Sequence, residues 1–158
     1  MNTFTTYFMI FLILITNICI SMEVQINTIN NCRDLQNMNS KGTYKINQTI
    51  DCSGVFPFNP IPLFSGVLLG NNFVIQNVFL NSISIGVGIF QDLSGATIQD
   101  LVLLNFTVNT TSNVVCGCLC AVANNTIITN VHLKAPPSSP NRILGGYFVG
   151  GLFFISLF

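Results

Sequence analysis

Three stretches of the chain repeat one pattern of apolar and polar positions. They are Ile75–Leu80, Ile98–Leu103 and Ile128–Leu133, and they share the pattern Ile-x-(Asn/Asp)-(Val/Leu)-x-Leu. Apolar residues that alternate with polar ones are typical of half-buried strands. The repetition therefore predicts equivalent short strands that recur along the chain.

The polar residue inside each copy predicts a corner between two short strands. This residue is Asn77 in the first copy, Asp100 in the second and Asn130 in the third. If the copies stack, like side chains lie above like side chains, and each unit buries its apolar face against its neighbours. We therefore expect a column that contains Ile75, Ile98 and Ile128, and a hydrogen-bonded ladder of the three corner residues.

A second pattern precedes the first at a constant distance. Gly88–Phe90 lies ahead of the second copy, Cys118–Cys120 ahead of the third, and Gly151–Phe153 begins what resembles a further copy. This recurrence favours an all-β fold, a right-handed parallel β-helix (solenoid) with a short N-terminal capping segment. A β-sandwich also has short strands, but it does not predict one hexad with one constant lead.

The N-terminus resembles a targeting segment. Tyr7–Ile20 is uncharged, shorter than the roughly 20 apolar residues of a membrane span, and followed by Ser21. Residues 1–21 are therefore predicted to be a signal peptide, and an uncleaved anchor is the alternative.

The rest of the chain divides into two parts. We expect residues 22–66 to form the cap and first strands, with a capping helix around Asp34–Asn39, a strand over Tyr44–Ile50 and a turn region over Cys52–Pro62. Residues 67–158 are expected to form the coils of the β-helix and to be truncated at the C-terminus.

The C-terminal stretch allows two interpretations. Ile143–Phe158 is uncharged and very apolar. It is predicted either as one more coil, which would leave an uncapped apolar edge, or as a membrane-directed tail. The loop over Ala135–Asn141 contains three prolines, which remove donors from a strand ladder.

Composition excludes several classes of function. The chain has 158 residues, of which 50% are hydrophobic and only 6% are charged, and its formal net charge is zero. Binding to nucleic acid depends on basic residues that neutralise phosphates, so no nucleic-acid partner is expected. The high hydrophobic content argues against a disordered chain.

Sequons and cysteines point to an exported protein. Four Asn-x-Ser/Thr sequons predict glycosylation, at Asn47, Asn105, Asn109 and Asn124. In an oxidising compartment Cys32 and Cys52 could close a loop as a disulfide. Removal of Cys19 with a signal peptide leaves an odd number of cysteines, and the sequence leaves open the pairing of Cys116, Cys118 and Cys120.

Candidate catalytic residues are few. The acids are Glu23, Asp34, Asp51, Asp92 and Asp100. Glycoside hydrolysis needs two suitably spaced carboxylates, and no pair recurs at neighbouring positions. The cysteines of Cys116–Cys120 are spaced more closely than usual zinc ligands. We therefore predict no catalytic residue, no cofactor and no metal site.

Much of the chain resembles a known family. Ile29–Met38, Gly42–Ile46, Ile50–Gly54, Pro60–Pro62 and Phe64–Ile75 resemble the opening of the Gly-Leu-x-Gly (GLUG) repeat proteins. Relatives of these proteins include filamentous-haemagglutinin-like surface proteins and the wider pectate-lyase-like right-handed β-helices. The resemblance spans roughly residues 29–133, and it implies a fold rather than a function.

The chain departs from the GLUG pattern in one repeat. Cys118 and Cys120 occupy the positions that Gly88 and Phe90 occupy in the preceding repeat.

These patterns predict a secreted or cell-surface protein. The expected function is non-catalytic adhesion or recognition, with glycans or other surface proteins as partners. A membrane contact is expected only through an uncleaved N-terminal segment or the C-terminal apolar tail. The alternatives are a remnant of a carbohydrate-active enzyme, such as a polysaccharide lyase or hydrolase, and a truncated fragment of a larger surface protein.

Overall fold

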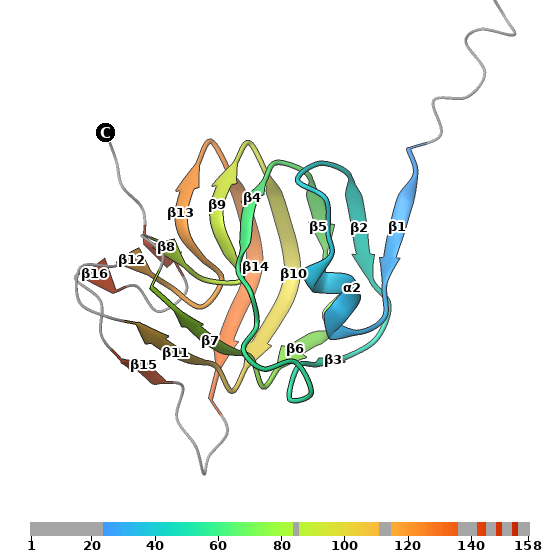
Figure 1. The fold of residues 1–158 in the computed structure, drawn as a ribbon. Coiled ribbons are helices and arrows are strands. Elements are labelled where there is room, and N and C mark those ends of the chain that lie inside the picture. The colour runs from blue at the N-terminus through green and yellow to red at the C-terminus, as the bar shows by residue number, and fades with distance from the viewer. Residues whose placement is uncertain are drawn as a thin grey trace, which may run out of the picture.

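Short parallel strands make up most of the regular structure in the described part of the chain (Figure 1). A computed structural model describes residues 24–83, 86–110, 115–135, 142–144, 148–149 and 153–154. The expected signal peptide, residues 1–21, lies outside the described residues. The all-β class is therefore seen directly, with one short helix in the described part.

A short helix follows the first strand. Strand β1 (Ile26–Ile29) leads into helix α2 (Cys32–Gln36). Asn31 caps the helix, because its side-chain oxygen accepts from the backbone N–H groups of Arg33 at 2.9 Å and Asp34 at 3.0 Å. The helix expected around Asp34–Asn39 thus exists, but the cap makes it begin earlier, at Cys32, and it ends at Gln36.

The largest sheet contains seven strands. Its main path runs β1-β2-β5-β10-β6-β3, and β14 pairs with β10 along nearly its whole length. The remaining bounds are β2 (Thr43–Ile46), β3 (Ile50–Asp51), β5 (Val67–Leu69), β6 (Val74–Gln76), β10 (Thr97–Leu104) and β14 (Ile127–Lys134). The single strand expected over Tyr44–Ile50 is therefore two strands, β2 and β3.

Three smaller sheets complete the fold, in the orders β15-β11-β7, β16-β12-β8 and β17-β13-β9-β4. All of their pairs are parallel. Their bounds are β4 (Ile61–Phe64), β7 (Phe79–Ser82), β8 (Gly86–Val87), β9 (Phe90–Ser94), β11 (Thr107–Thr110), β12 (Val115–Cys116), β13 (Cys120–Asn124), β15 (Arg142–Leu144), β16 (Phe148–Val149) and β17 (Phe153–Phe154).

The expected alignment of Ile75 is wrong. Ile98 does pair with Ile128, but Ile75 pairs with Leu103, and the position next to Ile98 on its other side belongs to Leu68. The predicted column is therefore two columns. They are Tyr44-Leu68-Ile98-Ile128 and Ile50-Ile75-Leu103-Leu133.

The corner residues follow the same division. Asn77, Asp100 and Asn130 all have the positive φ expected of corners, which Asn and Asp tolerate better than other non-glycine residues. Asn130 Nδ2 donates to Asp100 Oδ1 at 2.8 Å, as a ladder requires. Asn77 lies in a separate ladder, where its Oδ1 accepts from Asn105 Nδ2 at 2.6 Å.

The second repeated pattern is aligned as expected. Phe90 pairs with Cys120, and Cys120 pairs in turn with Phe153. Strands β15, β16 and β17 each add to a preceding parallel strand, as a further coil would require. The rest of the segment from residue 136 to the C-terminus lies outside the described residues.

The sheets enclose one apolar core, and among the described residues it holds no buried polar side chain. Four phenylalanines are its largest fully buried members, namely Phe58, Phe64, Phe90 and Phe106. Burial of apolar surface on this scale is the main term that stabilises the fold.

A disulfide joins the capping helix to the turn region. Cys32 and Cys52 form the bond, with their Cα atoms 5.2 Å apart and a sequence separation of 20. The loop closure expected from the sequence is therefore present. The one helix in the described part of the chain is too short to cross a membrane.

A substitution at Gly70 can test how closely adjacent strands approach each other. A Cβ at this position would collide with the backbone oxygen of Asp100 and lie 2.9 Å from Leu101 Cα. We expect Gly70→Ala to lower the free energy of unfolding by about 2 kcal/mol, because the backbone must shift. Urea unfolding measures the change.

Gly54→Ala is the matched control, since no atom lies within 4 Å of a Cβ at Gly54. We expect this variant to unfold within about 0.5 kcal/mol of the unmodified chain. Equal effects of the two substitutions would contradict the close approach of Gly70 to Asp100.

Candidate functional site

A groove lies beside the loop that follows the disulfide. It has a volume of about 300 Å³, and we call it the Phe56 groove. Its lining includes Ser53, Phe56, Asn77, Phe79, Asn105 and Thr107. Three chain segments contribute these residues: the loop after β3, the segment around the start of β7, and the corner before β11.

Long-range backbone hydrogen bonds hold the loop in place. At its start, Cys52 N–H donates to Gln76 O at 2.9 Å, and at its end Phe58 N–H donates to Phe79 O at 2.9 Å. The disulfide fixes Cys52 a second time. The loop is thus tied at both ends to the strands below it.

Phe56 forms an exposed aromatic surface. Its ring stacks on that of Phe79, with centroids 4.4 Å apart and planes 24° apart. The side chain of Phe56 is nevertheless 73% exposed, so its other face is open to solvent. A large aromatic ring held in this way on the surface is a stronger indication of a binding site than an isolated exposed aliphatic residue.

A column of polar side chains runs beside the aromatic pair. Asp51 Oδ1 accepts from Asn77 Nδ2 at 3.0 Å, and Asn77 in turn accepts from Asn105. Asp51 Oδ2 also accepts from Gln76 Nε2 at 3.1 Å. The amides are therefore oriented by each other, and they present a fixed set of donors and acceptors along the groove.

Hydrogen bonds hold Asp51 in its charged form. The backbone N–H of Ser53, at 2.9 Å from Asp51 Oδ1, and the amide of Asn77 lower the pKa of this carboxyl to about 2. A general acid needs a pKa near the working pH, so this carboxyl is poorly suited to donate a proton. The hydrogen bonds of Asp51 instead orient the neighbouring amides.

The groove thus combines an open aromatic face with fixed amides and hydroxyl groups. Binding pockets commonly have this composition, in which an apolar wall supplies contact area and a few polar groups set orientation. A sugar ring has matching surfaces, because its C–H groups lie on a face and its hydroxyls lie around the edge.

The four predicted sequons differ in accessibility. Asn47, Asn109 and Asn124 are exposed. Asn105 is half-buried, and its Nδ2 donates to Asn77 within the groove. Asn109 Nδ2 likewise donates to Asn81 Oδ1 at 3.4 Å, and glycosylation at the four positions stays a prediction.

The three cysteines of the repeat lie in the core. Cys116, Cys118 and Cys120 are all fully buried. Burial raises the pKa of Cys118 and of Cys120 to about 12, with smaller contributions from Cys116 and Asp92 respectively. Thiols of this kind stay protonated at neutral pH and act as small apolar groups.

Asp92 lies close enough to Cys120 to affect its pKa, and Asp100 is linked to His132 through Asn130. Over residues 24–83, 86–110 and 115–135 no three side chains of His, Cys, Asp or Glu are placed to hold a metal ion. Asp100 is bonded to Asn130, and His132 Nε2 lies 2.8 Å from Asn130 Oδ1. Sequence reasoning missed the Phe56 groove, and its only local signal is the run Phe56-Pro57-Phe58 in the turn region.

Comparisons with known proteins do not assign the chain to a family. No protein-family profile, curated protein or solved structure matches it. Similarity to the GLUG-repeat proteins therefore stays a prediction from the sequence.

Proposed function

We propose that this chain is a secreted or cell-surface right-handed parallel β-helix that recognises a carbohydrate without catalysis. The exposed Phe56 ring, stacked on Phe79 beside a column of oriented amides, is the observation that carries this proposal. The Phe56 groove is the proposed binding site, and one or two sugar units would match its volume of about 300 Å³.

The parallel pairing supports the β-helix. Paired strands from β2 to β14 lie 24 to 30 residues apart in sequence, as the pairs Tyr44 with Leu68 and Ile98 with Ile128 illustrate. Parallel crossovers are nearly always right-handed, which supports the proposed hand. The GLUG-like residues point to the same architecture.

Two features support export and the absence of catalysis. A disulfide is typical of proteins in oxidising compartments, and Cys32–Cys52 is such a bond. The carboxylate nearest the groove, Asp51, has a low pKa and accepts three hydrogen bonds. Such a group positions the amides rather than transferring a proton to a glycosidic oxygen.

Removal of the aromatic ring tests the proposal. We expect Phe56→Ala to weaken binding of a neutral oligosaccharide by about tenfold, because the ring supplies a large share of the contact area. An array of immobilised oligosaccharides first identifies a ligand. NMR titration of the ¹⁵N-labelled protein then gives the Kd and shows which amide signals move.

Ile83→Ala is the control, because Ile83 is 85% exposed and does not line the groove. It should leave the Kd unchanged. The proposal fails if no oligosaccharide binds, if the shifted signals lie away from Ser53, Asn77 and Asn105, or if both variants weaken binding equally.

A further inference from the structure

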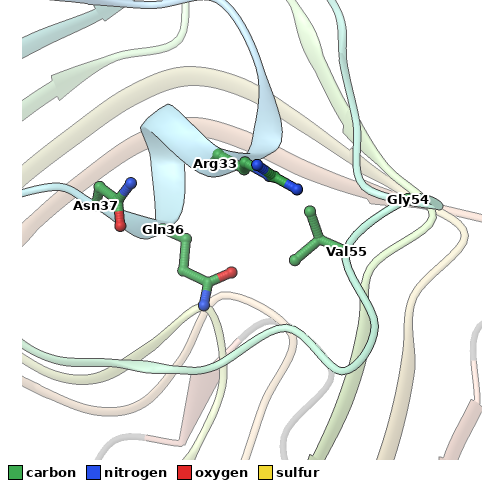
Figure 2. Close-up of a pocket in the computed structure, with 5 residues that line it drawn as sticks. All are labelled: Arg33, Gln36, Asn37, Gly54 and Val55. Atoms are coloured by element: carbon green, nitrogen blue, oxygen red, sulfur yellow. The ribbon is translucent and has the colours of Figure 1, made fainter.

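A second hollow lies on the other side of the same loop. It has a volume of about 280 Å³ and separates helix α2 from the residues after the disulfide (Figure 2). Arg33, Gln36 and Asn37 line it from the helix side, and Gly54 and Val55 line it from the loop. We call it the Arg33 pocket.

The disulfide builds this pocket. Cys32 immediately precedes Arg33 on the helix, and its bond to Cys52 holds the helix against the loop. Val55 N–H donates to Cys52 O at 2.9 Å, which shapes the loop into the facing wall. The two walls are therefore fixed relative to each other by one covalent bond and a local turn.

The pocket presents a cation and two amides. Figure 2 shows the Arg33 side chain reaching from the helix toward Val55, with the Gln36 amide beneath it. Within the described part of the chain the Arg33 guanidinium has no hydrogen bond or ion pair. Its five N–H donors are therefore open to an external acceptor.

Among the described residues, the two acids nearest to Arg33 in sequence are already engaged. Asp34 Oδ2 accepts from Asn30 N–H at 3.0 Å and from Asn31 Nδ2 at 2.9 Å, and Asp51 is held by the column beside the Phe56 groove. An Arg fork matches the planar geometry of a carboxylate, and it also binds sulfate through paired hydrogen bonds. An anionic group is thus the ligand that the pocket's chemistry favours.

The two hollows adjoin. Val55 lines both the Arg33 pocket and the Phe56 groove, so one extended ligand can reach both. We infer that the Arg33 pocket binds the carboxylate or sulfate group of a saccharide whose neighbouring unit lies on Phe56. This inference rests on the proposed function, and it adds that the ligand carries a negative charge.

Matched ligands test the inference. An oligosaccharide that carries carboxylates is compared by NMR titration with the same compound after its carboxyl groups have been reduced to alcohols. We expect Arg33→Gln to weaken binding of the acidic compound about tenfold and to leave the neutral one unchanged, because only the charge-assisted hydrogen bonds are lost. Phe56→Ala should weaken binding of both.

Lys45→Gln is the control, since Lys45 is an exposed cation that lines neither hollow. The inference is overturned if Lys45→Gln weakens acidic binding as much as Arg33→Gln does, because general attraction would then explain the effect. It is also overturned if both compounds bind equally to the unmodified protein.

Free acetate separates this inference from the proposed function. If acetate shifts the signals of Arg33 and Gln36 while no saccharide binds, the pocket is an anion site and the saccharide proposal fails. If neutral saccharides bind at Phe56 and the acidic ones bind no better, the saccharide proposal stands and the pocket inference fails.

Discussion

Replacing Phe90 by alanine is expected to lower the free energy of unfolding by about 3–5 kcal/mol. Phe90 is fully buried at the start of β9, and its ring stacks on Phe64 with centroids 5.2 Å apart. The backbone of Phe90 is paired on both sides, with Ile61 and with Cys120, so the neighbours cannot easily close the cavity. Equilibrium unfolding in urea measures the loss.

Phe56→Ala is the matched control for this substitution. The same atoms are removed, but from a side chain that is mostly exposed, so the expected loss is below about 1 kcal/mol. This variant also shows that the loss of saccharide binding does not arise from unfolding. Similar losses for the two variants would be inconsistent with the placement of Phe90 in the core.

Removing the disulfide is expected to cost about 3 kcal/mol. The bond closes a loop of 20 residues, and opening it increases the conformational freedom of the unfolded chain. The double variant Cys32→Ala and Cys52→Ala should show this loss in urea. Reduction of the unmodified chain with dithiothreitol should shift its unfolding midpoint in the same direction and to a similar extent.

Cys118→Ala separates the disulfide from a general effect of cysteine loss. Cys118 is a buried free thiol, so its replacement should cost about 1 kcal/mol and leave the response to dithiothreitol intact. The double variant should not respond to dithiothreitol. An unmodified chain whose unfolding midpoint is unaffected by the reductant would contradict the Cys32–Cys52 bond.

The repeated pattern predicted the strands and the corners but not their full register. The hexad that begins at Ile75 also fits Leu103–Val108, where Asn105 takes the place of Asn77. Consecutive corners of one turn thus carry the same pattern, and the sequence offers two alignments for Ile75. Packing favours Leu103, because Asn77 and Asn105 then join in a hydrogen bond.

The lead pattern was aligned correctly because it occurs only once in each turn. Phe90 and Cys120 each follow a buried residue and come before a longer strand. No second segment in the same turn of the stack has this order of residues. The disulfide was also accessible from sequence, since Cys32 and Cys52 lie close together in a polar first segment. A disulfide between these two cysteines closes only a short loop of the chain.

The Phe56 groove and the Arg33 pocket could not be predicted from the sequence. Phe56 lies in a turn that does not repeat, and its exposure depends on bonds from Cys52 and Phe58 to strands more than 20 residues away. Arg33 faces Val55 only because the disulfide brings the helix to the loop. Sites built by such long-range contacts leave little local pattern, which here is only the run Phe56-Pro57-Phe58.

The register of the stacked strands is tested most directly by backbone NOEs in a ¹⁵N,¹³C-labelled sample. Residues 74–76 should show NOEs to residues 102–104, and residues 97–99 should show NOEs to both 67–69 and 127–129. NOEs that instead join residues 74–76 to residues 97–99, or an absence of contacts between any of these strands, would contradict the parallel stack and the two hollows built on it.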